Sequence, residues 1–243
     1  MEGCPILINA IVFDVDDTLY DQQAPFKNAI ANCFPAYFGS LDLTRAYLSF
    51  RYHSDETFCK YISGEWTLNY MRFYRIREVL KEQGYSLTED QGLLFQENYE
   101  TELNSIQLLP EAKELLNALA SKSDIQIGII TNGPTDHQSK KIQQLQLEQW
   151  IPAEKMIISE SSGFAKPDRR IFDLAARQFK FEPSTTLYIG DNYDNDVNGA
   201  KEAGWQAFWF NHRKREKPVS LWSCDEEITE FHEFSSKVLS LLD

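Results

Sequence analysis

The stretch LINAIVFDVDDTLY, residues 7–20, decides the fold of this chain of 243 residues. It begins with the apolar run 8–13, which is rich in β-branched residues and typical of a parallel strand buried on both faces. Three carboxylates, Asp14, Asp16 and Asp17, follow directly. Such close like charges disfavour one another's ionisation, and a divalent cation is the usual way to offset that cost. Because ligands of open parallel sheets bind at the carboxyl ends of strands, the stretch predicts a metal site there.

Strand and helix patterns alternate in the second half of the chain. Beyond the first strand, strands are expected at residues 125–130, 156–158, 185–189 and 205–210. Helices are expected at residues 110–119, 135–147, 168–179, 194–203 and 227–242. This alternation predicts an α/β fold, with a Rossmann-like, doubly wound parallel sheet.

A helical block separates the first strand from this alternating region. Helices are expected at residues 21–38, 43–62, 67–83 and 88–103, with Asp21, Thr67 and Thr88 as N-terminal caps. The block is rich in aromatic side chains, most of which we expect to form its core. We therefore predict two domains. Residues 1–20 and 106–243 form the core domain, and residues 21–105 form an inserted all-helical domain.

The composition restricts the classes of partner. The formal charge is −13, so neither a nucleic-acid polymer nor an anionic membrane surface is expected to bind. The four cysteines are scattered and contain no CxxC pair, which indicates free thiols rather than disulfides or a zinc site. Neither a signal peptide nor a membrane span is recognisable. We expect a cytoplasmic protein that is a monomer or a homodimer.

Polar residues follow the other predicted strands as well. They are Thr131, Asn132, Gly133, Lys166, Asp191 and Asp196. Each of these is unremarkable alone, because a polar residue at a strand end is usually just exposed. Together with Asp14 and Asp16 they fall at the same edge of the predicted sheet, which indicates one site.

These stretches resemble the signature motifs of the haloacid dehalogenase (HAD) superfamily. The motifs are Asp14-Val-Asp16-Asp-Thr18-Leu19, Thr131-Asn132-Gly133, Lys166-Pro167 and Gly190-Asp191-Asn-Tyr-Asp-Asn-Asp196. They occur in the family's order and with sensible spacing, and the helical block resembles the family's type C1 cap. The resemblance implies Mg²⁺-dependent chemistry on a small phosphorylated metabolite.

The resemblance assigns roles to the carboxylates that follow the first strand. Asp14 is expected to be the nucleophile, which attacks phosphorus to give an aspartyl-phosphate. Asp16 is expected to protonate the leaving alcohol and then activate water. Because the first of these steps needs a neutral carboxyl, we expect the pKa of Asp16 to be raised near the phosphorylated site. Asp17 is expected only to shape the turn.

The remaining motif residues are expected to bind phosphate and metal. Thr131 and the backbone N–H groups of Asn132 and Gly133 would bind phosphate oxygens, and Lys166 would offset the charge of the phosphate. The resemblance places Mg²⁺ on Asp14, the carbonyl of Asp16, and Asp191. Asp196 would support the ion through water. For Asp194, an exposed helix cap is the favoured interpretation.

Two further sets of residues have no clear chemical role. The histidines show no metal-ligand spacing and are interpreted as surface or partly buried residues; they are His53, His137, His212 and His232. His137 would lie nearest to the site. The basic run Arg213 to Lys217 is interpreted as a solvated loop, with a contact to an anionic substrate as the alternative.

The substrate and the reaction class are less restricted. Asp16 favours a phosphatase over a dehalogenase, because dehalogenases of the family typically lack this carboxylate. Residues 130–133, 159–172 and 208–211 resemble a subgroup with pyrimidine 5′-nucleotidases and N-acylneuraminate-9-phosphatases, which favours a nucleoside 5′-monophosphate. A sugar-phosphate phosphatase, a phosphomutase and a non-catalytic binding or regulatory protein stay open as alternatives.

Overall fold

The computed structural model describes residues 7–242 and divides the chain into two compact units. One unit comprises Met1–Asp21 and Gln107–Asp243, and the other comprises Gln22–Ile106. The chain leaves the first unit after the first strand and returns to it after the helical block. Among the described residues, no helix has both the length and the apolar character that crossing a membrane requires.

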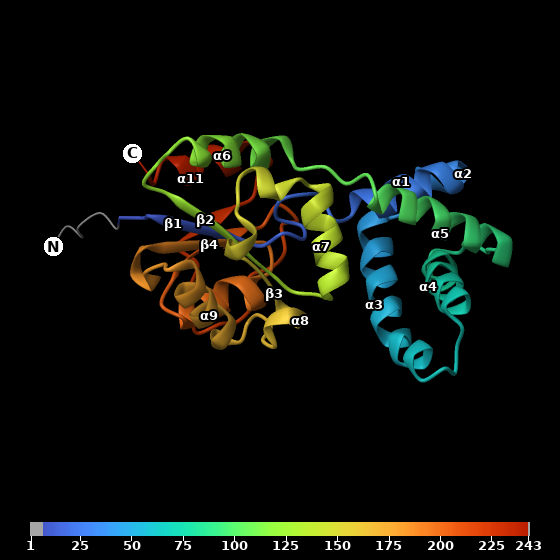
Figure 1. Cartoon of the computed structure of the whole chain (residues 1–243). Coiled ribbons are helices and arrows are strands. Elements are labelled where there is room, and N and C mark those ends of the chain that lie inside the picture. Colours follow the sequence, from blue (N-terminus) through green and yellow to red (C-terminus); the bar gives the residue numbers. More distant parts are fainter. Residues whose placement is uncertain (1–6, 243) are drawn as a thin grey trace. The chain divides into compact units, whose positions relative to one another are not determined.

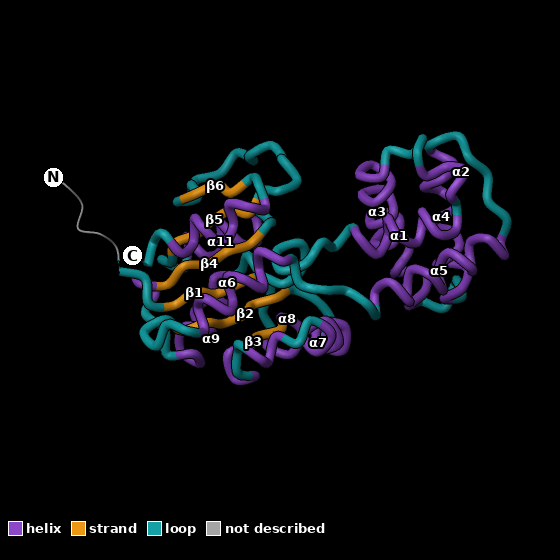
Figure 2. The backbone as a smooth tube through the Cα atoms, turned by 90° about the horizontal axis from the view of Figure 1, so that it is seen from above, coloured by secondary structure: helices purple, strands orange, loops and turns teal. Residues whose placement is uncertain are grey.

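The first unit is built on a parallel sheet of six strands in the order β3-β2-β1-β4-β5-β6 (Figure 2). The strands are β1 Ala10–Phe13, β2 Gln126–Thr131, β3 Met156–Ile158, β4 Thr186–Gly190, β5 Gln206–Phe210 and β6 Glu226–Ile228. All residues of β1 and β4 are buried, because helices cover both faces of the sheet. The predicted doubly wound α/β fold is therefore confirmed.

Helices flank the sheet on its two sides (Figure 1). Helices α6, Pro110–Ala120, and α11, Phe231–Leu239, pack together on one face, and α9, Arg169–Phe179, lies on the other. Shorter connections complete the unit: α7 Thr135–Gln144, α8 Ser159–Ser162 and α10 Gly199–Glu202. The helix predicted to begin at Asp168 begins at Arg169, and Asp168 is its N-cap, whose side chain accepts a hydrogen bond from the Arg170 N–H.

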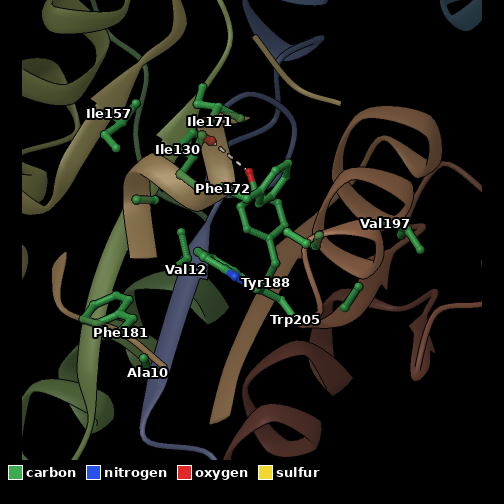
Figure 3. Packing of buried hydrophobic residues seen from close by; sticks show 14 of the residues in the cluster. Ala10, Val12, Ile130, Ile157, Ile171, Phe172, Phe181, Tyr188, Val197 and Trp205 are labelled. Carbon is green, nitrogen blue, oxygen red and sulfur yellow. Dashed lines mark hydrogen bonds between the residues drawn. The ribbon is translucent and has the colours of Figure 1, made fainter. Parts of the chain in front are cut away.

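A buried aromatic group joins α9 to the sheet (Figure 3). The Phe172 ring meets Tyr188 of β4 and Trp205 edge-on, at centroid distances of 5.3 and 5.5 Å. The Tyr188 hydroxyl donates a hydrogen bond to the Ile130 carbonyl at 2.8 Å, so a polar tip emerges from an otherwise apolar core. The Tyr188 side chain thus reaches from this core toward the carboxyl end of the sheet.

The C-terminal region differs from the prediction of one long helix over residues 227–242. Residues Glu226–Ile228 form β6 beside β5, and α11 begins only at Phe231. The Asp225 N–H donates to the Ala207 carbonyl at 2.8 Å, which continues the hydrogen bonds of the sheet. The strand was missed because it is three residues long and carries two acidic side chains, so its pattern does not distinguish it from the start of a helix.

The second unit is all helical. It contains α1 Ala24–Cys33, α2 Pro35–Phe38, α3 Leu43–Ile62, α4 Leu68–Glu82 and α5 Glu89–Leu103. Its core combines aromatic and aliphatic side chains, and the Phe26 ring lies 5.0 Å from Phe50 and 5.8 Å from Phe95. The predicted first helix is divided at Pro35 and begins at Ala24, so Asp21 does not cap it. The predicted caps Thr67 and Thr88 are confirmed, and Thr88 forms a capping box with Gln91.

Two other helix ends differ from the prediction. Helix α7 ends at Gln144 rather than at residue 147, where a separate turn of 3₁₀ helix begins. The expected helix 194–203 consists of a π-helical segment, Tyr193–Asn198, followed by α10, and its cap is Asn192 rather than Asp194. The Asn192 side chain accepts from the Asn195 N–H at 3.0 Å, while Asp194 is exposed as expected.

Two of the cysteines predicted to be free thiols, Cys33 and Cys224, are unpaired in the structure. Cys4 lies outside the described residues, and so does the side chain of Cys59.

The capping box predicts a local loss of stability when Thr88 is replaced. Thr88→Ala removes the acceptor for the Gln91 N–H and should lower the stability of α5 by about 1 kcal/mol. Native-state hydrogen exchange of the α5 amides measures this loss. Thr101→Ala is the matched control, because the Thr101 hydroxyl only donates to the Glu97 carbonyl inside the same helix. Equal protection in the two variants would contradict the prediction.

Candidate active site

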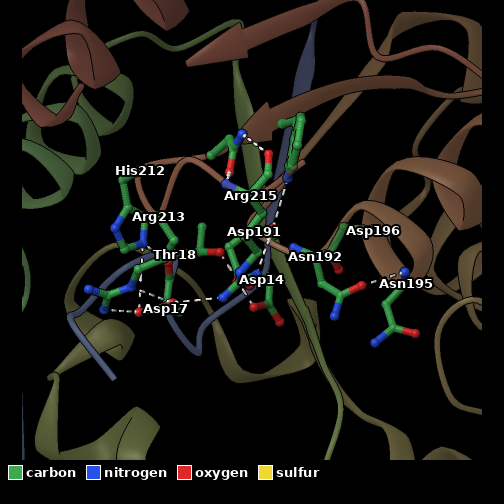
Figure 4. A network of polar contacts seen from close by, with 12 residues as sticks. Asp14, Asp17, Thr18, Asp191, Asn192, Asn195, Asp196, His212, Arg213 and Arg215 are labelled. Atoms are coloured by element: carbon green, nitrogen blue, oxygen red, sulfur yellow. Dashed lines mark hydrogen bonds and ion pairs between the residues drawn. The ribbon is translucent and has the colours of Figure 1, made fainter. Parts of the chain in front are cut away.

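Four of the residues singled out in the sequence meet at the carboxyl ends of β1 and β4, and Figure 4 shows the three carboxylates among them, Asp14, Asp191 and Asp196. Asp14 follows β1, Asp191 and Asp196 follow β4, and Lys166 reaches them from the segment before α9. Asp14, Asp191 and Asp196 are buried, and each offers an oxygen within 4.8 Å of the other two. The common sheet edge brings together residues that lie up to 182 positions apart in the sequence, from Asp14 to Asp196.

Lys166 is the central cation of this group. Its Nζ lies 2.7 Å from Asp14 Oδ1, 2.6 Å from Asp196 Oδ1 and 2.8 Å from the Tyr188 hydroxyl. The three N–H donors of the ammonium therefore each have a partner. Burial alone would lower the pKa of Lys166, but Asp14 and Asp196 outweigh it and hold the pKa above its usual value. Lys166 is thus a fixed positive charge.

Asp14 is held at the end of β1 by its backbone, whose N–H donates to the Ile189 carbonyl at 2.9 Å. Burial raises the pKa of its carboxyl, Lys166 opposes this, and the charges of Asp196 and Asp16 add to it, so that the pKa is about 7. Without a further cation, the carboxyl is therefore partly protonated near neutral pH.

The Asp191–Asp196 segment folds tightly over the end of β4. The Asn192 N–H donates to Asp196 Oδ2 at 2.9 Å, which turns this carboxylate back toward the strand. A Cβ atom on Gly190 would lie only 2.2 Å from the same oxygen, so only glycine fits there. Burial, followed by the charges of Asp196 and Asp14, raises the pKa of Asp191 well above its usual value, although Arg215 opposes the shift.

Asp16 lies in a different environment from Asp14. Lys141 of α7 donates to both of its oxygens at 2.6 and 2.7 Å, Gln138 donates at 2.8 Å, and the Tyr20 hydroxyl donates as well. Burial would raise the pKa of Asp16, but the ion pair and these hydrogen bonds outweigh it and lower the pKa. The raised pKa was expected for the phosphorylated site, so it stays a prediction, and the contact of Lys141 with Asp16 was not anticipated.

The Thr131–Asn132–Gly133 segment combines an unused donor with a rigid support. Among the described residues, the buried Thr131 hydroxyl has no hydrogen-bond partner, which suits a ligand oxygen. The Asn132 side chain accepts from the Lys166 N–H and donates to the Lys166 carbonyl, both at 2.9 Å. The Gly133 N–H donates to Ser159 Oγ at 2.9 Å. The expected contact of this N–H with phosphate is therefore not supported.

The loop after β5 was interpreted as solvated, and of the predicted features it differs most from the structure. Arg213 donates to both carboxylate oxygens of Asp17 and also pairs with Asp21. Arg215 pairs with Asp191 at 2.7 Å and with Asp17 at 3.3 Å. Asp17 has a positive φ of 58°, so it shapes the turn as expected but also anchors this loop. Buried carboxylates attract these arginines, whereas the run looks like a surface loop in the sequence alone.

The histidines show no metal-binding geometry in the described part of the chain. His137 is exposed, and its neighbour Gln138 faces the site instead. A ring nitrogen of the partly buried His212 lies 2.8 Å from the Asp17 carbonyl, and one of His53 lies 2.8 Å from Glu82. His232 is exposed. The interpretation of surface or partly buried histidines therefore holds for three of the four, while His53 is buried.

Several side chains of the site were missed in the sequence. They are Tyr20, Gln138, Lys141, Ser159, Tyr188 and Arg215. A signal existed for the pair on α7, because Gln138 and Lys141 are three residues apart and lie on one helix face. Tyr188 lies in an apolar strand pattern that does not distinguish it from core residues. The basic run around Arg215 does not show that this side chain binds Asp191.

The donor set fits a divalent cation. Three buried carboxylates that share a small space repel one another, and oxygen ligands of this kind suit Mg²⁺. The Asp16 side chain does not belong to this group, so a contribution from Asp16 rests on its carbonyl, and this stays a prediction. Asp196 does belong to it but is also bound to Lys166, which is compatible with the supporting role predicted for it.

Comparison with known proteins places this geometry among hydrolases. The haloacid dehalogenase-like hydrolase family matches residues 8–204. The chain is 29% identical over 221 residues to the glyceraldehyde 3-phosphate phosphatase of Pyrococcus furiosus, which covers 85% of this chain and 82% of that protein. It is 37% identical over 114 residues to the pyrimidine 5′-nucleotidase YjjG of Escherichia coli, covering 46% and 49%.

A solved structure shares the whole fold. It is the HAD-hydrolase YfnB of Bacillus subtilis bound to magnesium, with a TM-score of 0.66 and 26% identity. The similarity covers 98% of this chain and 99% of that one, so it includes both the sheet and the inserted helices.

The pKa of Asp14 predicts that cation binding weakens below neutral pH. Below its pKa of about 7 the carboxyl holds a proton that a cation must displace. Calorimetric titration with MgCl₂ should therefore give an affinity about 10-fold weaker at about pH 6 than at about pH 8. The exposed-carboxylate variant Asp194→Asn should show the same dependence. Equal affinity at both pH values would contradict the raised pKa.

Proposed function

Because the chain belongs to the haloacid dehalogenase-like hydrolases and is a phosphatase of that family, we propose that it is a Mg²⁺-dependent phosphomonoester hydrolase. It acts through an aspartyl-phosphate on a small phosphorylated metabolite, with a nucleoside 5′-monophosphate as the first candidate. The observation that carries this proposal is the buried Asp14 carboxylate, which Lys166 fixes beside Asp191 and Asp196. A non-catalytic binding role is disfavoured by the intact pair Asp14 and Asp16.

Asp14 is the proposed nucleophile. Its carboxylate oxygen forms a bond to phosphorus, the ester P–O bond breaks, and the leaving oxygen takes up a proton. Lys166 contributes a positive charge 2.7 Å from the attacking carboxylate, which allows a phosphate dianion to approach. Because all three Lys166 donors have partners, it acts as a fixed charge and needs no rearrangement.

Asp14 and Asp191, with the carbonyl of Asp16, would hold Mg²⁺, and Asp196 would support it. When bound, the ion supplies positive charge that offsets the carboxylates and the charge developing on the transferred phosphoryl group. Thr131 would donate its unused hydroxyl to a phosphate oxygen. The Asn132 N–H would add a second donor, from a loop that its own side chain fixes to Lys166.

Asp16 is the proposed acid and base. As a base it would take a proton from the water that hydrolyses the aspartyl-phosphate, and the ionised form that Lys141 stabilises is ready for this step. As an acid it would first protonate the leaving oxygen. A phosphate dianion beside Asp16 favours its protonated form, so substrate binding would oppose the effect of Lys141.

The helical unit is the proposed cap and the proposed source of substrate selectivity. Most of its aromatic rings form its own core, but Tyr52 and Tyr70 are exposed, and Trp66 lies 4.8 Å from Tyr70. Aromatic faces of this kind can stack on a nucleobase. The similarity to the E. coli pyrimidine 5′-nucleotidase supports this substrate, although it covers 49% of that protein.

A sugar or triose phosphate is the second candidate. The similarity to the P. furiosus glyceraldehyde 3-phosphate phosphatase covers 82% of that protein and 85% of this chain, so it extends into the helical unit of this chain. A phosphomutase would share the proposed first step and differ in the acceptor of the phosphoryl group.

Replacement of the nucleophile should abolish phosphatase activity. With Mg²⁺ and p-nitrophenyl phosphate, Asp14→Asn should lower kcat by a factor on the order of 10⁴ or more, because an amide oxygen is a poor nucleophile. The control is Asp194→Asn, which removes an exposed carboxylate near the same strand end and should keep full activity. Full activity in Asp14→Asn would disprove the nucleophile assignment.

A substrate panel separates the two candidates. Phosphate release should be fastest with pyrimidine nucleoside 5′-monophosphates if the cap stacks a base, and kcat/KM should fall for ribose 5-phosphate, which lacks the base. A higher kcat/KM for triose or sugar phosphates would favour the second candidate. Inertness toward all of these esters with Mg²⁺ would contradict the proposed function.

A further inference from the structure

We propose that Arg215 is a positioning residue for Asp191, and that the loop after β5 is built to present it. Arg215 would hold the Asp191 carboxylate in the orientation that binds the divalent cation. This rests on the proposed role of Asp191 as a metal ligand. It concerns a residue outside the four sequence motifs, in the segment that the sequence marked only as a basic run.

The contacts of Arg215 with Asp191 restrict the side chain and the backbone together. One guanidinium nitrogen, Nη1, donates to Asp191 Oδ2 at 2.7 Å and to the Asp191 carbonyl oxygen at 3.2 Å. Because both acceptors belong to the same residue, the shared donor fixes the side-chain torsion of Asp191. The indole N–H of Trp209 donates to the same carbonyl at 2.9 Å, so the backbone is held from a second side.

The loop that carries Arg215 is closed by a buried side chain. Asn211 Oδ1 accepts from the Arg215 N–H at 2.8 Å, and Asn211 Nδ2 donates to the Arg215 carbonyl at 3.0 Å. The same Nδ2 lies 2.7 Å from Glu227 Oε1 of β6, which connects the loop to the edge of the sheet. The position of Arg215 is therefore set by the sheet, even though its side chain is 42% exposed.

The basic side chains of this loop pair with carboxylates in two different places. Lys214 has a positive φ of 53°, and its side chain pairs with Glu230 at 2.8 Å. Arg213 and Arg215 instead both contact Asp17, at the turn after β1 (Figure 4). The two arginines therefore connect the end of β1, through Asp17, to the end of β4, through Asp191.

Such a connection is needed because the proposed ligands repel one another. Asp191 lies beside the carboxylates of Asp14 and Asp196, with no other ion-pair partner than Arg215 in the described part of the chain. Arg215 has two opposed effects on the cation: its charge repels Mg²⁺, and its hydrogen bonds orient a ligand. Because its charge is shared with Asp17, we infer that orientation dominates. Loss of such an outer partner typically costs about 10–100-fold in metal affinity.

Calorimetric titration of the full chain with MgCl₂ tests the proposal by the direction of the change. Arg215→Met should weaken Mg²⁺ binding about 10–100-fold. Arg215→Lys should also weaken Mg²⁺ binding, because lysine ends in one ammonium group instead of the forked guanidinium. A single ammonium cannot contact the Asp191 carbonyl, Asp191 Oδ2 and Asp17 at the same time. Lys214→Met is the matched control, with the same change of charge one residue away, and it should bind Mg²⁺ like the unaltered protein.

Two results would overturn the proposal. Tighter Mg²⁺ binding in Arg215→Met, with unchanged affinity in Arg215→Lys, would show that the guanidinium only repels the cation. Unchanged affinity in both variants would remove any role for Arg215. Thermal unfolding without Mg²⁺ shows that each variant is folded before titration.

Asp191→Asn distinguishes a failure of this proposal from a failure of the proposed metal site. If Asp191→Asn weakens Mg²⁺ binding while Arg215→Met does not, only the role of Arg215 is wrong. If Asp191→Asn binds Mg²⁺ like the unaltered protein, the metal assignment itself is wrong, and the role of Arg215 is lost with it.

Discussion

The concentration of negative charge at the ends of β1 and β4 is the constraint on which the rest of the site depends. Asp14, Asp191 and Asp196 share a small buried space, and buried like charges are costly unless cations and hydrogen bonds offset them. Lys166 offsets part of this charge from within the group, and Arg215 does so from its edge. Burial and the charges of the neighbouring carboxylates still raise the pKa of Asp14, and a divalent cation would supply the positive charge that is missing.

The same strand end gives its two proposed catalytic carboxyls opposite environments. Burial, together with the charges of Asp196 and Asp16, raises the pKa of Asp14 although Lys166 opposes the shift, whereas Lys141 and Gln138 of α7 outweigh burial and lower the pKa of Asp16. Neighbouring carboxyls with divergent pKa values are a recurring basis for different roles in one reaction. Here the difference arises from their partners, because Asp14 binds Lys166, whereas Asp16 binds Lys141 and Gln138 of α7.

How much could be predicted from the sequence depended on whether the signal was local. The order of strands and helices, the charged end of β1 and the capping box at Thr88 are short-range patterns, and they were recognised. The short strand β6 was missed because two of its three residues are acidic and resemble the start of a helix, and the break at Pro35 was missed because a helical pattern can continue across a proline. Lys141 and Arg215 were missed for another reason: their partners lie 125 and 24 residues away.

The sequence by itself determined the α/β class, the inserted helical block and the residues that meet at the sheet edge. It could do so because parallel strands bring their carboxyl ends to one edge whatever the loops between them do. Only the tertiary structure decided which charges pair. Lys166 binds Asp14 and Asp196, Lys141 binds Asp16, and the basic run turns inward to Asp17 and Asp191. Ion pairing depends on distances of a few ångströms between side chains, and only the folded chain sets them.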